Sequence, residues 1–510
     1  MNRRNFLKIT GACFAGPFLP RECKSRADSD IQNKGKISGR PNILLIMTDQ
    51  QFADAMSCRM GRQFIHTPAM DGLASAGILF SRAYSANPLC MPLRNSLFTG
   101  RYPHETGVTS NDHSKGSLDP KEFPLMGTYF KKAGYETAYY GKWHICMDVK
   151  KPADHGFDNI DTRGSADTPT VDKAVAFLEQ KHDKPFLLVA SFVNPHNICE
   201  WSRRLAGRKQ TLSCGEIGDP PSLEQLPPAP FNMAPPKNEP DGMSMMRRSY
   251  QVESGLFPVG KFTSEDWRRH RWGYYRMIEK VDGEIARLLD VLRKSGQEEN
   301  TLIVFTSDHG DCAGAHRFNQ KTVFYDESAR VPLIMTWKGR IEPCVNEKLV
   351  NTGIDVLPTF LDAAGVSIPG KLPGHSLLPL ATGTSAVDWP DYVTVQNNMV
   401  QGGEVDGVKL AMEGRMLRTD QYKYCVYNGG NHRESLVDMK SDGGESNNLA
   451  HDPGYRDVLL RHRELLARYG KAYNDDLVEK LLADDVRALP FALVKEVSQH
   501  KPVKEYSNTR

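Results

Sequence analysis

The chain has 510 residues, of which 39% are hydrophobic and 25% are charged, and this length allows one large domain and a smaller one. The formal net charge is only +3, and the excess of basic over acidic residues before position 31 accounts for it. The rest of the chain is close to neutral. This argues against a nucleic-acid-binding protein, because such proteins keep a basic excess.

Residues 1–36 are predicted to be an export signal followed by a linker. Arg3-Arg4-Asn5-Phe6-Leu7-Lys8 resembles a twin-arginine signal, and the apolar stretch after it, residues 9–19, is too short to cross a bilayer. We therefore expect an exported, periplasmic protein. Lipid attachment at Cys13 and a disordered basic tail are the alternatives. No other segment has the roughly 18 uninterrupted apolar residues that a transmembrane helix needs.

Four short apolar runs predict buried strands of a parallel sheet, at residues 42–47, 136–140, 186–192 and 301–305. A helical stripe between the third and fourth runs carries Tyr274, Ile278, Val281, Ile285, Leu288 and Leu292, and Ser295-Gly296 ends it. Alternating strands and helices indicate an α/β fold with a large, mostly parallel central sheet flanked by helices.

Polar residues follow each of the four runs. They are Asp49 and Gln50, then Lys142 and His144, then His196, and finally Asp308 and His309. Ligands bind at the carboxyl ends of the strands in such folds, so we place the functional site there.

The later chain predicts an insertion and a smaller subdomain. Residues 198–261 are rich in Pro, Met, Gly and Arg, and we expect a long insertion over the site or a mobile surface loop. Residues 415–427 predict a hairpin and residues 452–473 a helix. We therefore divide the chain into a catalytic domain at 37–376 and a C-terminal α+β subdomain at 377–510.

Cys90 differs from the other nine cysteines, which are thinly spread and show no zinc-site spacing. Pro92 and Gly100 frame a short helix that would place Cys90 at its N-terminus, where unpaired N–H groups favour an anion. Arg94 lies one turn further on. By spacing alone, a buried structural cysteine beside a surface arginine is the favoured alternative.

The segment 88–104, containing Cys90-Met91-Pro92-Leu93-Arg94, resembles the sulfatase signature. Residues 41–50, Gly141-Lys142-Trp143-His144, Ser307-Asp308-His309-Gly310-Asp311, Lys321 and the later Leu436-Val437-Asp438 also resemble this family, in the family's order. The resemblance implies an alkaline phosphatase-like fold and a formylglycine made from Cys90 by a formylglycine-generating or an anaerobic sulfatase-maturating enzyme. Leu93 departs from the family, which usually has serine there.

The resemblance also implies a Ca²⁺ site formed by Asp49, Gln50, Asp308, His309 and the modified residue 90. Many sulfatases have Asp and Asn where this chain has Gln50 and His309. The exchange lowers the charge of the site, which leaves Mn²⁺ or Mg²⁺ as alternatives.

The implied reaction passes through a covalent sulfo-enzyme intermediate. Arg94, Lys142 and Lys321 would hold the sulfonyl oxygens, His196 would protonate the leaving alcohol, and His144 would take a proton from the remaining hydroxyl of residue 90. His104 is expected to order the loop after the helix, and His316 to contact either substrate or backbone.

We therefore expect a sulfatase whose substrate is a sulfated carbohydrate. A phosphonate monoester or phosphodiester hydrolase that uses the same residues is the nearest alternative. A non-catalytic binding protein is a further one.

Overall fold

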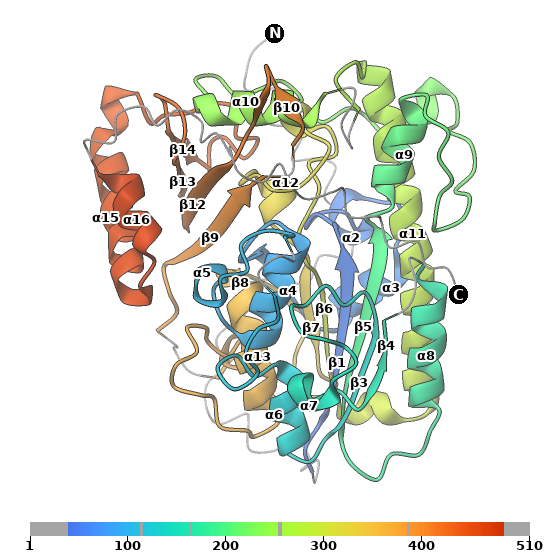
Figure 1. Ribbon diagram of the computed structural model, residues 1–510. Helices are drawn as coiled ribbons and strands as arrows, with labels where there is room; N and C mark the ends of the chain where they lie inside the picture. The colour runs from blue at the N-terminus through green and yellow to red at the C-terminus, as the bar shows by residue number, and fades with distance from the viewer. Residues whose placement is uncertain are drawn as a thin grey trace.

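An eight-stranded sheet forms the centre of the computed structural model, in the order β4-β3-β5-β1-β6-β7-β2-β8 (Figure 1). Among these strands only β7 runs against the others, because its pairings with β6 and β2 are antiparallel. The strands are β1 (Asn42–Asp49), β2 (Ile78–Tyr84), β3 (Glu136–Gly141), β4 (Asn159–Asp161), β5 (Phe186–Pro195), β6 (Thr301–Ser307), β7 (Leu333–Thr336) and β8 (Cys344–Asn351). The four predicted strands are confirmed as the adjacent parallel strands β3, β5, β1 and β6.

The structure describes residues 39–112, 116–162, 166–252, 258–384, 388–400 and 402–483. The predicted export signal, including Cys13, lies outside these ranges. Within them, no helix combines the length and the apolar character needed to cross a membrane.

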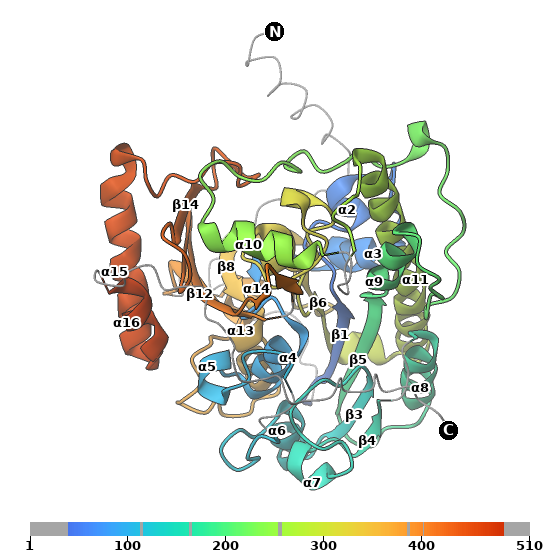
Figure 2. The same ribbon diagram turned by 45° about the horizontal axis from the view of Figure 1, so that its top comes forward.

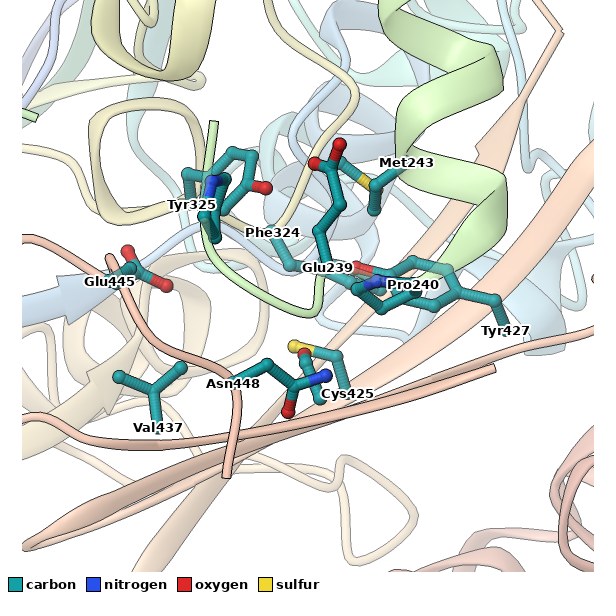
Figure 3. Close-up of a pocket in the computed structure, with 12 residues that line it drawn as sticks. Glu239, Pro240, Met243, Phe324, Tyr325, Cys425, Tyr427, Val437, Glu445 and Asn448 are labelled. Atoms are coloured by element: carbon teal, nitrogen blue, oxygen red, sulfur yellow. The ribbon is translucent and has the colours of Figure 1, made fainter. Parts of the chain in front are cut away.

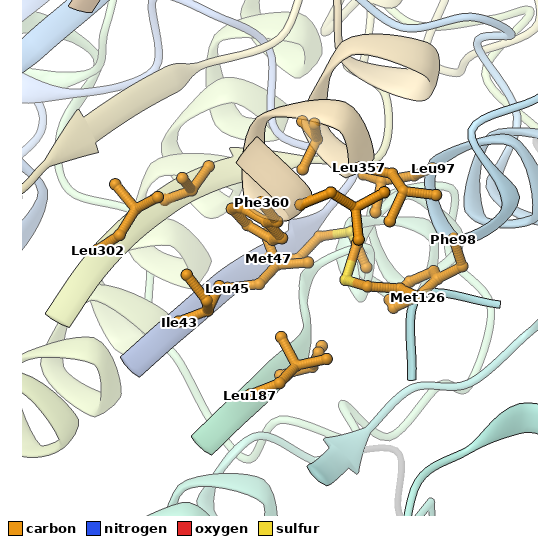
Figure 4. Packing of buried hydrophobic residues seen from close by; sticks show 14 of the residues in the cluster. Ile43, Leu45, Met47, Leu97, Phe98, Met126, Leu187, Leu302, Leu357 and Phe360 are labelled. Carbon is orange, nitrogen blue, oxygen red and sulfur yellow. The ribbon is translucent and has the colours of Figure 1, made fainter. Parts of the chain in front are cut away.

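Both faces of the sheet are buried, which explains why its strands are continuously apolar. Successive side chains of a strand point to opposite faces. Ile43, Leu45 and Met47 of β1 therefore join one hydrophobic cluster, while Leu44 and Ile46 join another. Figure 4 shows the first cluster, where Leu45 packs near Leu357 and Phe360.

Two groups of helices cover the two faces. α4 (Cys90–Thr99), α6 (Met126–Lys132) and α13 (Thr352–Ala363) contribute to the first cluster, and α3 (Pro68–Ala76), α8 (Thr168–Leu178) and α11 (Ser264–Lys294) to the second. α11 is the predicted striped helix, and it ends at Ser295 as expected. The shorter helices are α2 (Ser57–Met60), α5 (Pro103–Thr106), α7 (Pro152–His155), α12 (Asp326–Ala329) and α14 (Leu378–Thr382).

A second, antiparallel sheet in the order β14-β13-β12-β9 lies beside the first. Its strands are β9 (Tyr392–Met399), β12 (Met412–Thr419), β13 (Tyr422–Tyr427) and β14 (Glu434–Asp438), covered by α15 (Arg456–Tyr473) and α16 (Asp476–Leu482) at the left of Figure 1. The predicted hairpin is β12–β13, and α15 is the predicted helix. The α/β class with a mostly parallel sheet and a smaller C-terminal sheet is thus confirmed.

The segment 198–261 contains more regular structure than its composition predicted. It forms α9 (Ile198–Leu205), which packs against α11, and α10 (Asp241–Tyr250), which contacts the small hairpin of β10 (Glu404–Val405) and β11 (Val408–Lys409). Figure 2 shows α10 lying across the molecule near the C-terminal sheet. Both helices are short, so their apolar residues repeat too few times to stand out from the prolines around them.

Replacing Leu45 by alanine should lower the free energy of unfolding by about 2–5 kcal/mol, because the fully buried side chain leaves a cavity between the sheet and α13. Urea denaturation measures this change. Leu460→Ala is the matched control, since 47% of Leu460 is exposed, and its effect should stay within about 0.5 kcal/mol. Equal losses in both variants would contradict the assigned core.

Candidate functional site

Side chains from the carboxyl ends of four neighbouring strands meet around Cys90. Asp49 is the last residue of β1, and Asp308 comes directly after β6. Lys142 follows β3, and His196 follows β5. The sheet therefore brings together residues that are up to 259 positions apart in the sequence, at the edge where the strand order predicted a site.

Cys90 is the first residue of α4, and the extended backbone of Leu89 precedes it. Its Sγ lies 3.1 Å from His309 Nε2, 3.2 Å from Lys321 Nζ and 3.8 Å from Asp49 Oδ1. Burial opposes ionisation of the thiol, but Lys142, Lys321 and His309 together hold the pKa of Cys90 well below its usual range. Residue 90 thus sits in a strongly electropositive, water-poor environment.

Leu93, which departs from the family pattern, packs against α13. It is fully buried against the start of α13, where Gly353 approaches α4 so closely that a Cβ at position 353 would lie 3.2 Å from Leu93 Cδ1. The leucine therefore fills space at the interface between two helices.

Arg94 makes more hydrogen bonds within the protein than the sequence predicted. Its Nε donates to Asp308 Oδ2 at 3.0 Å and one terminal nitrogen to Asp49 Oδ2 at 3.3 Å, while the other donates to Lys142 O and Ser191 Oγ, both at 2.8 Å. Four of the five N–H donors of a guanidinium are thereby used. The sequence placed Arg94 on the substrate anion, whereas the structure shows it holding two carboxylates in place.

Four of the five predicted metal ligands form a compact buried cluster. Ligand atoms of Asp49, Cys90, Asp308 and His309 all lie within 4.8 Å of one another. His309 Nδ1 lies 2.9 Å from Gly310 O and donates its proton there, so Nε2 faces the cluster. Despite burial, Asp308 and Cys90 raise the pKa of His309, and a bound cation would take the place of the proton on Nε2. Two carboxylates and an imidazole whose Nε2 faces them are a donor set that fits a divalent cation.

Gln50, the fifth predicted ligand, is engaged differently. Its Nε2 donates to Asp311 Oδ2 at 2.6 Å, and its Oε1 accepts a hydrogen bond from Lys321 Nζ at 2.7 Å. In the structure Gln50 Oε1 therefore contacts Lys321, and a role of Gln50 as metal ligand remains a prediction.

The remaining predicted residues surround Cys90 with groups in different protonation states. Burial lowers the pKa of His144, and burial together with Lys321 and Lys142 lowers the pKa of His196 to about 4. Burial opposes the charge of Lys321, but Cys90 and Asp49 raise its pKa above the usual value. Lys142 Nζ forms an ion pair with Asp49. At neutral pH Lys321 is therefore charged and lies near the neutral imidazoles of His144 and His196.

Two other histidines lie outside this cluster. His104 Nε2 is 2.9 Å from Tyr473 O and its ring contacts Gln396, so it connects α5, which follows α4, to the C-terminal subdomain. His316 is buried, stacks on Tyr325 with ring centroids 3.8 Å apart, and its carbonyl accepts a hydrogen bond from Arg247. Both form protein contacts, as was expected of His104.

Asp311 and Ser191 are site residues that sequence reasoning did not single out. Asp311 stands in the Ser307–Asp311 motif and could have been found from its spacing to Asp308. Ser191 lies in the middle of an apolar strand, where a serine is a weak signal, and only the fold places its hydroxyl beside Arg94.

A cavity of about 20 Å³ lies in a different place, between the segment leading into α10 and the C-terminal sheet (Figure 3). Glu239, Tyr325 and Glu445 line it together with Cys425 and Asn448. This volume suffices for a single water molecule with several polar partners, and it excludes a substrate.

Comparison with known proteins agrees with this geometry. A family model described as Sulfatase matches residues 41–366, and a model described as N-sulphoglucosamine sulphohydrolase, C-terminal, matches residues 314–471. The Delta 4,5-hexuronate-2-O-sulfatase of Bacteroides thetaiotaomicron is 31% identical over 452 residues, which cover 86% of this chain and 90% of that protein.

Two solved structures share the fold over most of the chain. One is a 2-O GAG sulfatase with 30% identity and a TM-score of 0.74, covering 86% of this chain and 94% of that one. The other is a structure in complex with its substrate, D-glucosamine-2-N,6-O-disulfate, with 25% identity and a TM-score of 0.70, covering 86% and 98% of the two chains.

Asp308→Asn should weaken binding of a divalent cation by more than the roughly 10- to 100-fold that follows loss of a residue supporting a metal ligand. The reason is that the exchange removes one carboxylate charge from the buried cluster. Elemental analysis after dialysis, and the rise in Tm on adding Ca²⁺, measure the effect. His104→Gln should retain metal as the wild type does, and metal retention by the Asp308 variant would contradict the assignment.

Proposed function

The chain belongs to the sulfatase family and is a sulfuric ester hydrolase, and on this premise we propose that its substrate is a sulfated carbohydrate. The similar proteins named above act on sulfated sugars according to their descriptions, which supports this substrate class. The observation that carries the proposal is the position of Cys90, at a helix N-terminus between Lys321, His309 and Asp49.

We further propose that Cys90 is converted to formylglycine by a sulfatase-maturating enzyme. Formylglycine supplies a hydrated aldehyde, one hydroxyl of which attacks sulfur while the second allows release of sulfate. Pro92 and Arg94 are the other features that maturation requires by family resemblance, and both are present. Leu93 is the departure from the family pattern in this segment, and its buried side chain packs against the start of α13.

The charged residues of the chain orient and neutralise the sulfate group. Lys142 and Lys321 place two ammonium groups beside residue 90, where negative charge lies in both the substrate and the transition state. Lys321, with its raised pKa, carries a proton that it can share with the leaving oxygen. His144 and His196 have lowered pKa values and are neutral, so His144 can accept a proton from residue 90. The predicted donation from His196 to the leaving alcohol requires that His196 first take up a proton.

Asp49, Asp308 and His309 would hold a divalent cation together with residue 90. When bound, such an ion adds Lewis-acid stabilisation of negative charge at this position. We propose Ca²⁺, because two carboxylates suit a hard cation, with Mn²⁺ or Mg²⁺ as the alternatives that the imidazole ligand allows.

The substrate class is tested with a panel of defined sulfated mono- and disaccharides, including unsaturated 2-O-sulfated hexuronates and 6-O-sulfated glucosamines. We expect turnover of at least one sugar, and loss of turnover in Cys90→Ala by about 10⁴-fold or more, because the nucleophile is removed. Sulfate release measured by ion chromatography reports both. A matched phosphonate monoester that is hydrolysed much faster than every sulfate would overturn the proposal.

Peptide mass spectrometry is the control for this panel. Protein made beside a maturating enzyme should show residue 90 with a carbonyl oxygen in place of the thiol and one hydrogen. An inactive preparation that retains cysteine at position 90 tests only maturation, whereas an inactive preparation carrying formylglycine contradicts the substrate class.

We propose that the protein is exported to the periplasm through the twin-arginine signal at its N-terminus. Exchanging Arg3 and Arg4 for lysine should leave the full-length precursor in the cytoplasm, because the paired arginines are read by a receptor. Cell fractionation followed by immunoblotting measures the distribution, and Arg21→Lys is the matched control. Unimpaired export of the double variant would contradict this route.

A further inference from the structure

Gln50 connects Lys321 to a second buried carboxylate, Asp311, that the proposed reaction does not use. The chain of contacts runs from Asp311 Oδ2 to Gln50 Nε2 at 2.6 Å, from Gln50 Oε1 to Lys321 Nζ at 2.7 Å, and from Lys321 Nζ to Cys90 Sγ at 3.2 Å. Gln50 and Asp311 are fully buried, and Lys321 is 3% exposed. Water therefore cannot replace these partners.

The orientation of the Gln50 amide follows from its neighbours. A carboxylate needs a donor, and an ammonium group needs an acceptor, so Nε2 must face Asp311 and Oε1 must face Lys321. Asp311 is itself anchored, because its Oδ1 accepts a hydrogen bond from Ala313 N at 2.6 Å. The neutral Gln50 amide thus links the fixed Asp311 carboxylate to the Lys321 ammonium.

The backbone of Gln50 is also held in an unusual conformation. Its φ of 72° lies in the left-handed region, which residues with a Cβ seldom adopt. Its N–H donates to Asp308 Oδ1 at 3.1 Å, and its carbonyl accepts a hydrogen bond from Tyr274 Oη at 2.6 Å. Strain of this kind persists where the surroundings over-determine it, typically at functional sites.

We propose that Gln50 and Asp311 are positioning residues that hold the Lys321 ammonium against residue 90 and the sulfate group, and that Gln50 is not a metal ligand. The amide oxygen is the atom by which Gln50 could bind a hard cation, and it faces the Lys321 ammonium, whose positive charge disfavours a cation at the same oxygen. The inference rests on the proposed function for the identity of the anion that Lys321 meets.

We call the chain of contacts from Asp311 through Gln50 to Lys321 the relay. A reciprocal exchange of the side chains at positions 311 and 50 tests it. Asp311→Asn places an amide donor against Gln50 Nε2, which should turn the Gln50 amide and leave Lys321 without its acceptor. Gln50→Glu places two carboxylates at the same contact. Each single change should lower kcat/KM by about 10- to 100-fold. The double variant restores a donor at position 311 and an acceptor for Lys321 at the same net charge, so it should be more active than either single variant.

Titration calorimetry with inorganic sulfate gives a second readout that does not depend on turnover. Both single variants should bind sulfate more weakly than the wild type, and the double variant should recover affinity. A double variant that is no better than Asp311→Asn in both measurements would overturn the relay.

Metal content separates the two possible roles of Gln50. Gln50→Leu should lower kcat/KM while binding as much divalent metal as the wild type. Loss of metal from this variant would overturn the proposal and make Gln50 a ligand. Gln51→Leu is the matched control, because this buried neighbour donates to Ala55 O and contacts Met70 instead of Lys321. It should lose stability but keep its affinity for sulfate.

Failure of the proposed function would look different. If the wild type hydrolyses phosphonates rather than sulfates, the sulfatase substrate is wrong, yet the same order of variants on the phosphonate would still support the relay. If the wild type hydrolyses sulfates and all four variants match it, the relay alone is wrong.

Discussion

The buried guanidinium of Arg94 is the contact on which the site depends, because it joins the ends of four strands. Asp49 belongs to β1, Asp308 follows β6, the Lys142 carbonyl follows β3, and Ser191 lies in β5. Burying two carboxylates side by side is costly unless a positive charge lies next to them. Burial and the neighbouring Asp49 raise the pKa of Asp308, and the Arg94 guanidinium opposes this rise. Arg94 thus holds the predicted metal ligands in place, and it lies on the same helix, α4, as Cys90. This helix therefore carries both the precursor of the nucleophile and the positive charge that orients the side chains around it.

The C-terminal sheet helps to position the site around Cys90 through Lys423. Lys423 of β13 donates to Phe324 O at 3.0 Å and to Glu445 Oε1 at 2.8 Å, and it also pairs with Asp326. These contacts hold the segment just after Lys321. Thr322 N donates to Pro88 O at 2.9 Å, which attaches the same segment to the residues just before α4. The second subdomain therefore contributes to the site by fixing where the Lys321 ammonium can be, although none of its strands supplies a residue to the cluster around Cys90.

The parallel strands and α4 could be predicted because their signals are local: apolar runs, a polar residue at each strand end, and proline and glycine around Cys90. The reversed direction of β7 could not, because a four-residue apolar strand carries no sign of its partner. α9 and α10 were missed because prolines and glycines around them dominate the local pattern. The roles of Arg94 and Gln50 depend on which partners the fold brings to each donor and acceptor, and those partners lie up to 271 residues away.

Leu93 and Gly353 carry a consequence for how this sequence can vary. A methyl group at position 353 would lie 2.4 Å from Ala86 Cβ and 3.2 Å from both Leu93 Cδ1 and Ser96 Cβ. The Leu93 side chain occupies part of the space that a side chain at position 353 would need, and close-packed interiors tolerate little change in volume. Substitutions at positions 93 and 353 are consequently coupled. Serine at position 93, the residue common in the family, would relieve only part of this restriction, since Ala86 would still exclude a side chain at position 353.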